Sequence, residues 1–254
     1  MSEVKLTKFD LKRYDRQMII SGWGINGQRR LKSSKVVVMG AGGLGSPALI
    51  YLAAVGVGKL TIVDDERFEL SNLNRQVLGW QRDIGRLKAE VAAEKLRELN
   101  PDLEVVADVA KITRENVRGL VRDANVVVDG MDNWSTRFII NWGCVREGVP
   151  FIHAGIYGFS GQITTIVPGK GPCLRCILPR MPEEIKRFPV VGATPALLAS
   201  LQVMEVIKLI LGIGEPLIGR MLIVDGLKMN FTEVAVKRKA SCPVCSKRDE
   251  DVVV

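Results

Sequence analysis

The sequence contains 254 residues, of which 47% are hydrophobic and 25% are charged, which fits one large α/β core and excludes an intrinsically disordered chain. The formal net charge of +8 would suit a nucleic acid or an acidic protein partner. No RNA-binding motif with stacking aromatic residues accompanies this charge, so nucleic acid is the less favoured partner.

The sequence gives no reason to expect a membrane protein. The first residues lack the apolar segment of a secretory signal. The most apolar helical segment, residues 196–211, contains Gln202, Glu205 and Lys208. We therefore expect a cytoplasmic protein without a membrane span.

An N-terminal arm, residues 9–31, precedes the first predicted strand. Asp10 is predicted to be the N-cap of a helix of about two to three turns in this arm. Residues 36–39, VVVM, are predicted to form a buried strand that leads directly into a glycine-rich turn. A helix over residues 46–55 should then end at Gly56, and residues 59–63 should form the next strand.

The glycine-rich turn, residues 40–45, fits the pattern G-x-G-x-x-G. Gly40 allows the tight turn, Gly42 lets backbone N–H groups approach a phosphate, and Gly45 lets the helix pack on the strand. The helix N-terminus offers free N–H donors to an anion, and Asp64, after the second strand, can bind ribose hydroxyls. Such a turn alone is common, but in this order of elements it predicts a nucleotide site.

The rest of the chain continues the alternation of strands and helices. Residues 71–82 are expected to form a loop or a short helix over the strand ends. Further helices are predicted over residues 85–99, 114–121, 134–147 and 196–211, and further strands over residues 103–107, 125–128 and 151–156. Strand 162–167 follows too closely for a helical crossover and should pair antiparallel. Residues 177–193 should form a mobile loop, residues 221–224 and 231–236 a hairpin, and residues 247–254 a loose tail.

These elements predict an α/β fold with a Rossmann-like, doubly wound and mostly parallel sheet, followed by an antiparallel C-terminal extension. We expect a single domain over residues 1–254. It would consist of the arm (9–31), a nucleotide-binding core (32–157) and a C-terminal part (158–254) with the antiparallel strands, the crossover loop, a zinc site and the tail.

Charged and polar side chains are expected at the carboxyl ends of the strands, where ligands bind in such a sheet. Asp64 ends the second strand, and Asn72 and Arg75 lie just beyond it. Lys88 begins the following helix, and Asp132 follows strand 125–128. Taken singly, Arg75, Lys88 and Asp132 would each be a solvated charge on a loop. Together they predict a site for a triphosphate and its magnesium ion.

Four of the five cysteines form two C-x-x-C pairs, CLRC and CPVC. Two such pairs predict a tetrahedral zinc site with Cys173, Cys176, Cys242 and Cys245 as ligands. A closed site of four thiolates leaves no coordination position for water, so we expect it to be structural. Disulfides are less expected in a cytoplasmic chain.

The remaining candidates for chemistry are predicted to be structural. Cys144 is expected to be a buried, inert thiol. His153, the only histidine, is expected to be a hydrogen-bonded core residue and neither a ligand nor a base. Trp134 and Trp142 are also expected in the core.

These residues make the chain resemble the E1-like activating enzymes, the family of MoeB, ThiF and HesA proteins and of the adenylation domains of ubiquitin-activating enzymes, with MoeB as the nearest type. The matching motifs span nearly the whole chain in the expected order: RYDRQ (13–17), GAGGLGS (40–46), Asp64, SNLNRQ (71–76), GRLK (85–88), MDN (131–133), both C-x-x-C pairs and SLQVMEVIK (200–208). RYDRQ and SNLNRQ together with the paired cysteines are specific, whereas the glycines alone are not.

The resemblance implies an adenylyltransferase that uses ATP and Mg²⁺. Such an enzyme adenylates the C-terminal glycine carboxylate of a small ubiquitin-like sulfur-carrier protein and releases pyrophosphate, in molybdopterin, thiamine or tRNA thiolation pathways. By motif, Gly43 would approach the phosphates and Asp64 would hold the ribose. Asn72, Arg75 and Lys88 would neutralise the triphosphate, Asp132 would bind magnesium, and Ser71, Asn74 and Asn133 would make further contacts with the nucleotide.

The resemblance also implies a homodimer with shared sites. Arg16 resembles the arginine that reaches the ATP of the neighbouring subunit, and Arg13 could assist it. Arg187 is a candidate for guiding the Gly-Gly tail of the carrier.

Two departures from the family pattern bear on these expectations. Leu87 stands where the family usually has proline, which affects the expected placement of Lys88. Residues 177–193 contain no cysteine, whereas members that form a thioester or persulfide usually carry one in this crossover. We therefore expect the enzyme to stop at the acyl-adenylate and to rely on a separate sulfur donor.

Three other functions are compatible with parts of the sequence. A nicotinamide-dependent dehydrogenase would share the glycine turn and Asp64, but it would need a substrate domain and an acid–base residue, and neither is evident. A tRNA-modifying ATP-dependent cyclase or dehydratase of the same broad family would suit the positive charge. A non-catalytic scaffold with a decayed site is disfavoured by the joint presence of Arg16, Arg75, Lys88 and Asp132.

Overall fold

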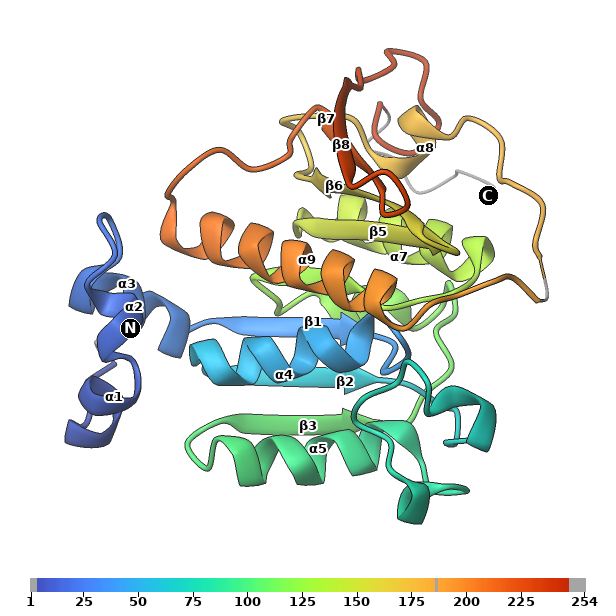
Figure 1. Ribbon diagram of the computed structural model, residues 1–254. Coiled ribbons are helices and arrows are strands. Elements are labelled where there is room, and N and C mark those ends of the chain that lie inside the picture. The colour runs from blue at the N-terminus through green and yellow to red at the C-terminus, as the bar shows by residue number, and fades with distance from the viewer. Residues whose placement is uncertain (1–3, 186, 247–254) are drawn as a thin grey trace.

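A computed structural model describes residues 4–185 and 187–246. It is built on an eight-stranded sheet with the strand order β3-β2-β1-β4-β5-β6-β7-β8 (Figure 1). The parallel strands are β1 (Lys35–Met39), β2 (Lys59–Val63), β3 (Glu104–Asp108), β4 (Val126–Asp129) and β5 (Phe151–Tyr157). The predicted doubly wound, mostly parallel sheet is confirmed.

The sheet changes direction after β5. β6 (Ser160–Ile166) pairs antiparallel with β5. β7 (Arg220–Asp225) and β8 (Asn230–Ala235) continue this antiparallel extension. The predicted antiparallel strand and the final hairpin are therefore confirmed.

Helices cover both faces of the sheet. α4 (Gly45–Val55), α5 (Lys88–Leu99) and α9 (Ala193–Leu211) lie on one face (Figure 1). α6 (Val117–Val121) and α7 (Trp134–Glu147) pack into a separate core on the other face. Val36 and Val38 of β1 pack into the hydrophobic core that also contains residues of α4, α5 and α9. Val37 and Met39 pack into the core that contains residues of α6 and α7. β1 is thus buried on both faces, which explains its uninterrupted apolar run.

The turn between β1 and α4 requires glycine at two positions. Gly40 has φ +97°, and a Cβ there would lie 2.7 Å from the carbonyl oxygen of Gly130. A Cβ on Gly45 would lie 1.9 Å from the carbonyl oxygen of Gly40. The predicted roles of both residues, a tight turn and close packing of helix on strand, are confirmed.

The N-terminal arm differs from the prediction. Thr7, and not Asp10, is the N-cap of α1 (Lys8–Arg13), and Asp10 accepts the backbone N–H of Thr7 at 2.7 Å in a capping box. The buried Asp10 also pairs with Lys32, and this ion pair holds it at the third helical position. Two further short helices, α2 (Asp15–Met18) and α3 (Gly24–Lys32), complete the arm.

Other boundaries shift by a few residues. α5 begins at Lys88 because Gly85, at φ +86°, still belongs to the preceding loop. That loop contains the 3₁₀ turns η1 (Leu70–Asn72) and η2 (Gln81–Asp83). A short helix that the sequence did not indicate, α8 (Leu174–Ile177), precedes the crossover loop. The predicted tail at 247–254 lies outside the described residues.

α9 is long and apolar enough, by length and composition, to cross a membrane, but 50% of its most apolar window is buried inside the protein. The Gln202 amide donates to the backbone oxygens of Asp129 and Ile152, and Glu205 accepts the backbone N–H of Leu217. The polar residues of α9 therefore fasten it to the sheet, as expected for the core helix of a globular protein.

Candidate functional site

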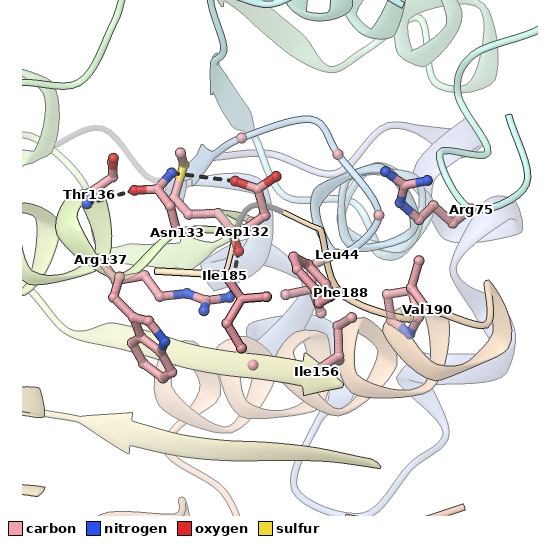
Figure 2. A pocket seen from close by; sticks show the side chains of 18 of the residues that line it. Leu44, Arg75, Asp132, Asn133, Thr136, Arg137, Ile156, Ile185, Phe188 and Val190 are labelled. Carbon is pink, nitrogen blue, oxygen red and sulfur yellow. Dashed lines mark hydrogen bonds between the residues drawn. The ribbon is translucent and has the colours of Figure 1, made fainter. Parts of the chain in front are cut away.

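The carboxyl ends of the parallel strands open into a cavity of about 1100 Å³. Its wall includes the glycine turn, the polar loop after β2, the loop after β4 and the crossover loop before α9 (Figure 2). Most of the residues predicted to bind nucleotide line it: Gly40, Gly42, Gly43, Asp64, Ser71, Asn74, Arg75, Lys88, Asp132 and Asn133.

Space remains in front of the glycine turn. A Cβ on Gly42 would have its nearest neighbour, the Gln76 amide, at 3.7 Å, and a Cβ on Gly43 would meet Arg75 and Pro195 at 3.5 Å. These are ordinary contact distances, so the packing of the protein does not itself require glycine there. A group bound against the backbone N–H groups of the turn would require it.

Asp64 is fixed beside the turn by backbone donors. One carboxylate oxygen accepts the N–H of Ala41 at 2.7 Å, and the other accepts the N–H of Glu66 at 2.8 Å. Burial raises the pKa of Asp64 above its usual range, while these donors and the charge of Lys88 act in the opposite direction. A carboxylate held in this way is suited to accept hydrogen bonds from ribose hydroxyls.

Two cations line the same cavity. Lys88 is the first residue of α5, and its ammonium nitrogen lies 2.6 Å from a carboxylate oxygen of Glu66. Leu87, the departure from the family pattern, has extended backbone immediately before the helix and does not keep Lys88 from the cavity. The Arg75 guanidinium donates to the backbone oxygen of Ser71 at 2.9 Å and to the Asn74 side chain at 3.0 Å.

Asp132 and Asn133 follow β4, and their side chains differ in the hydrogen bonds that they make. The carboxylate of the exposed Asp132 receives one long hydrogen bond within the described residues, from the Asn133 amide at 3.4 Å. The Asn133 oxygen caps α7 by accepting the N–H of Thr136 at 2.9 Å. Carboxylate oxygens are preferred ligands of Mg²⁺, so Asp132 has the chemistry to hold this cation.

Three predicted site residues do not line the cavity. Gly45 lies inside α4, and the buried Asn72 accepts the backbone N–H of Glu69 at 3.0 Å, so its side chain shapes the polar loop. Arg16 is exposed on α2 and does not line the cavity. α2 lies beside the amino ends of the strands, at the other end of the sheet from their carboxyl ends (Figure 1).

The cavity also contains residues that the sequence did not single out. Arg137 of α7 is buried and lines the wall, and Lys111 lines it from the loop after β3. Trp134 was expected in the core, but it is only partly buried and lines the cavity, because it stands at the start of α7 next to the loop of Asp132. Trp142 is buried, as predicted.

The crossover loop between α8 and α9 covers the cavity. Three apolar residues of this loop line the cavity: Ile185, Phe188 and Val190 (Figure 2). Glu184 accepts the backbone N–H of Ser135 at 2.8 Å, which ties the loop to the start of α7. The predicted mobility of this loop stays a prediction.

The four paired cysteines form a compact cluster away from the cavity. Their sulfur atoms all lie within 4.8 Å of one another. The Cys173–Cys242 distance is 3.6 Å and the Cys176–Cys245 distance is 3.4 Å. A zinc ion with four thiolates at about 2.3 Å would place the sulfurs roughly 3.8 Å apart. The cluster therefore has the composition and size to bind a metal ion.

Cys144 and His153 are buried as predicted. Burial raises the pKa of the Cys144 thiol far above its usual range, so the thiol is protonated and unreactive. The His153 Nδ1 atom lies 2.6 Å from a carboxylate oxygen of Asp129. The prediction of a hydrogen-bonded core histidine is therefore confirmed.

Comparisons with known proteins agree with this arrangement. Residues 14–244 match the ThiF family. A SAMP-activating enzyme E1 of Haloferax volcanii is 45% identical over 98% of this chain and 94% of the relative. A sulfur carrier protein adenylyltransferase of Thermus thermophilus is 42% identical over 95% of this chain and 93% of the relative.

A sulfur carrier protein ThiS adenylyltransferase of Escherichia coli is 39% identical over 96% of this chain and 98% of the relative. Among solved structures, Escherichia coli MccB with MccA-N7isoASN superposes with a TM-score of 0.86 at 25% identity, over 97% of this chain and 77% of that chain. The chain therefore belongs to the ThiF family of E1-like enzymes and is an adenylyltransferase.

Proposed function

We propose that this enzyme activates the C-terminal glycine carboxylate of a small ubiquitin-like sulfur carrier ending in Gly-Gly, for sulfur transfer in molybdopterin, thiamine or tRNA thiolation. The main support is one cavity that is lined by a glycine turn, the fixed carboxylate of Asp64, the cations Arg75 and Lys88, and the exposed carboxylate of Asp132. Relatives named for SAMP and for sulfur carriers support the same class of substrate.

In the proposed reaction an oxygen of the carrier's terminal carboxylate attacks the α-phosphorus of ATP. The bond between the α-phosphorus and the bridging oxygen breaks, pyrophosphate leaves, and the acyl-adenylate forms. A terminal carboxyl group has a pKa of roughly 3.5 and is already ionised at neutral pH. No general base is required, which agrees with a sole histidine that is buried and bonded to Asp129.

The roles of the cavity residues follow from their chemistry. Backbone N–H groups at Gly42 and Gly43 bind the phosphates, and Asp64 binds the ribose. Arg75 and Lys88 neutralise the charge that develops on the leaving pyrophosphate. Asp132 holds the Mg²⁺ that accompanies ATP, and this ion, when bound, neutralises phosphate charge. Ser71, Asn74 and Asn133 complete the nucleotide site, and Asn72 orders the loop that carries Arg75.

The enzyme acts as a homodimer in this proposal. Arg16 belongs to α2, which lies beside the amino ends of the strands (Figure 1), and it does not line the cavity of its own subunit. α4 and α9 lie side by side and expose Tyr51, Leu197 and Met204, an apolar surface that a second copy would bury. A partner packed on this face supplies Arg16, with Arg13 in support, to the neighbouring cavity.

The reaction stops at the acyl-adenylate, and a separate sulfur donor continues it. Residues 177–193 contain no cysteine. Cys144, the one cysteine outside the four-cysteine cluster, is buried and protonated. A reducible covalent adduct between enzyme and carrier, lost on Cys144→Ser, would contradict this part of the proposal.

The carrier tail enters beneath the crossover loop. Pro182, Ile185 and Phe188 offer it an apolar wall, and Arg187 stands in the same wall. An extended Gly-Gly tail has no side chains to accommodate, so this wall can enclose it closely. Arg187 then pairs with a carbonyl or carboxylate group of the tail.

The cysteine cluster binds structural zinc, and the chain forms one cytoplasmic domain. The cluster joins two residues that precede α9 in the chain to two residues that follow β8, so the metal ties the C-terminal segment to the body of the protein. The four cysteines of the cluster match a closed zinc site of four thiolates. Cysteines free of disulfides suit a reducing compartment.

ATP–pyrophosphate exchange tests the proposed function. A panel of small ubiquitin-like proteins ending in Gly-Gly should include one that supports exchange, and deletion of its terminal glycine should abolish the exchange. ATP consumption that depends on tRNA, with no exchange for any carrier of the panel, would instead identify a tRNA-modifying enzyme.

A further inference from the structure

A buried network of three side chains lies behind the turn that carries Asp132. Asp129, the last residue of β4, is 0% exposed, and its carboxylate accepts the backbone N–H of Met131 at 3.0 Å. It also accepts the Arg137 Nε–H at 3.1 Å and lies 2.6 Å from His153 Nδ1. Neither Asp129 nor His153 lines the cavity.

Arg137 connects this network to the same turn from the other side. Its Nη2 donates to the backbone oxygen of Met131 at 2.5 Å and to that of Ala154 at 3.0 Å. Both backbone polar groups of Met131 are thus held by the Asp129–Arg137 pair. Asp132 is the next residue, so the pair fixes the backbone position from which the Asp132 side chain projects.

His153 takes part in this network through one nitrogen. Its side chain is 0% exposed, and Nε2 has no hydrogen-bond partner in the part of the chain that the structure describes. Asp129 already has a positive partner in Arg137, and burial lowers the pKa of His153, so the imidazole is neutral and Nδ1–H donates to Asp129. That single hydrogen bond is the polar role of the residue.

Asp132 depends on the turn for its position. Among the described residues its carboxylate receives only the long hydrogen bond from Asn133, so no short hydrogen bond fixes it. Groups that orient a metal-binding side chain from behind commonly set the affinity for the metal without touching it. The network has the geometry for this role because it fixes the backbone from which Asp132 projects.

We infer that Asp129 and His153 are positioning residues that, through Arg137 and the backbone of Met131, aim the Asp132 carboxylate at the Mg²⁺ of bound Mg·ATP. This inference rests on the proposed function, in which Asp132 holds Mg²⁺. It assigns a role in metal binding to the sole histidine, and that role is indirect.

The test measures how strongly Mg²⁺ improves nucleotide binding, with no turnover. The dissociation constant of α,β-methylene ATP is measured calorimetrically with Mg²⁺ and with EDTA, and the ratio of the two values is the coupling factor. A general loss of structure would weaken both values alike and leave the ratio unchanged. His153→Leu removes the hydrogen bond to Asp129 and should lower the coupling factor by about 10-fold. This is the lower end of the scale for loss of a hydrogen-bond partner of a metal ligand, because His153 acts through Asp129 and the backbone of Met131.

Two variants serve as matched controls. In His153→Asn the side-chain amide nitrogen can take the place of Nδ1, and since Nε2 has no partner, the coupling factor should stay within about threefold of wild type. Asn141→Leu removes another buried hydrogen bond, in which the Asn141 oxygen accepts the N–H of Leu174. Asn141 does not line the cavity, so this change should leave the factor unchanged. Folding of each variant is checked by its melting temperature.

The possible outcomes separate the inference from the function on which it rests. A wild-type enzyme whose nucleotide affinity is the same with Mg²⁺ and with EDTA would overturn the proposed magnesium site itself. A wild-type enzyme with strong coupling, accompanied by a folded His153→Leu variant with the same coupling, would overturn the positioning role alone. Loss of coupling in His153→Leu and its return in His153→Asn would support the inference.

Discussion

The ammonium nitrogen of Lys88 lies 2.6 Å from a carboxylate oxygen of Glu66 at the cavity wall, with the lysine side chain 4% exposed and the glutamate side chain 67% exposed. The lysine is therefore fixed, whereas its partner is largely solvated. An ion pair with a solvent-exposed partner contributes little free energy, so breaking it costs little. A nucleotide phosphate can therefore take the place of Glu66 beside Lys88.

The first prediction concerns the two cations. Lys88→Ala and Arg75→Ala should each lower the rate of ATP–pyrophosphate exchange by about 10²–10³-fold, the scale for loss of one positioned donor that stabilises developing charge. The melting temperatures should change far less, because both groups face the cavity. Exchange rates within tenfold of wild type for both variants would contradict the assignment.

The second prediction has the opposite sign and concerns Glu66. Glu66→Gln removes the carboxylate that competes with phosphate for Lys88, so the dissociation constant of ATP should fall by up to about fivefold, the modest scale of an exposed ion pair. Calorimetric titration with ATP measures the change. Glu90→Gln, an exposed residue two positions beyond Lys88 that does not line the cavity, is the control. Weaker binding in Glu66→Gln would mean that Glu66 holds Lys88 in place.

The third prediction follows from the raised pKa of Asp64. Folding places this carboxyl in a site where it binds its proton at a higher pH than in the unfolded chain, so its contribution to stability is present at low pH and is lost as the pH rises through the raised pKa. Ribose binding has the reverse dependence, because only the ionised carboxylate accepts both hydroxyls. The affinity for adenosine, which has no phosphates, should therefore fall as the pH falls through that pKa.

Adenosine binding between about pH 4 and pH 7 measures this dependence. Asp64→Asn should remove it together with most of the affinity. Asp65→Asn, at the exposed neighbouring position in the same cavity, should keep it. A pH profile that is the same in Asp64→Asn and in wild type would assign the titration to another group.

The sequence predicted the part of the fold that local signals determine. Val-rich strands between glycine turns and amphipathic helices are recognisable because their periodicity reflects burial along one segment. The carboxyl ends of parallel strands share one edge, so Asp64 and Asp132 could be placed in one site without coordinates. The parallel pairing of β1 to β5 and the antiparallel pairing of β6 follow from the same rules.

The missed features depend on contacts between distant segments. Thr7 and Asp10 are both acceptable caps by type, and the ion pair with Lys32 decides between them. Arg137 is an ordinary helical arginine in sequence, and its burial depends on Asp129 at the end of the preceding strand. Trp134 has the hydrophobicity of a core residue, but its place at the start of α7 puts it at the cavity wall.

The fourth prediction concerns Arg16 and the proposed dimer. Arg16→Ala and Lys88→Ala should each abolish most of the exchange activity, because each substitution removes one of the two cations from both sites of the dimer. Mixed after partial unfolding and reassembly, the two inactive variants form heterodimers in which one site keeps both residues, and about a quarter of wild-type activity should return for random pairing. If heterodimers form but no activity returns, Arg16 does not act in the site of the neighbouring subunit.

The fifth prediction concerns the cysteine cluster. Cys173→Ser and Cys242→Ser should reduce the zinc content of the purified protein to near zero, because each ligand completes a four-thiolate site. Metal binding contributes directly to folding stability, so chelation should lower the melting temperature of the wild type by at least about 5 °C. Cys144→Ala lies outside the cluster and should retain zinc.

Loss of zinc should lower the melting temperature but change the affinity for ATP only slightly, because none of the four cysteines lines the cavity. The metal and the nucleotide stabilise different parts of the chain: the glycine turn and Asp64 belong to the parallel half of the sheet, whereas the cluster lies beyond β6 in the chain. Calorimetric titration of the zinc-free protein with Mg·ATP, at a temperature below its lowered transition, separates the two effects. A chelated protein that melts like the wild type and contains no zinc would show that the cysteine cluster is not a zinc site.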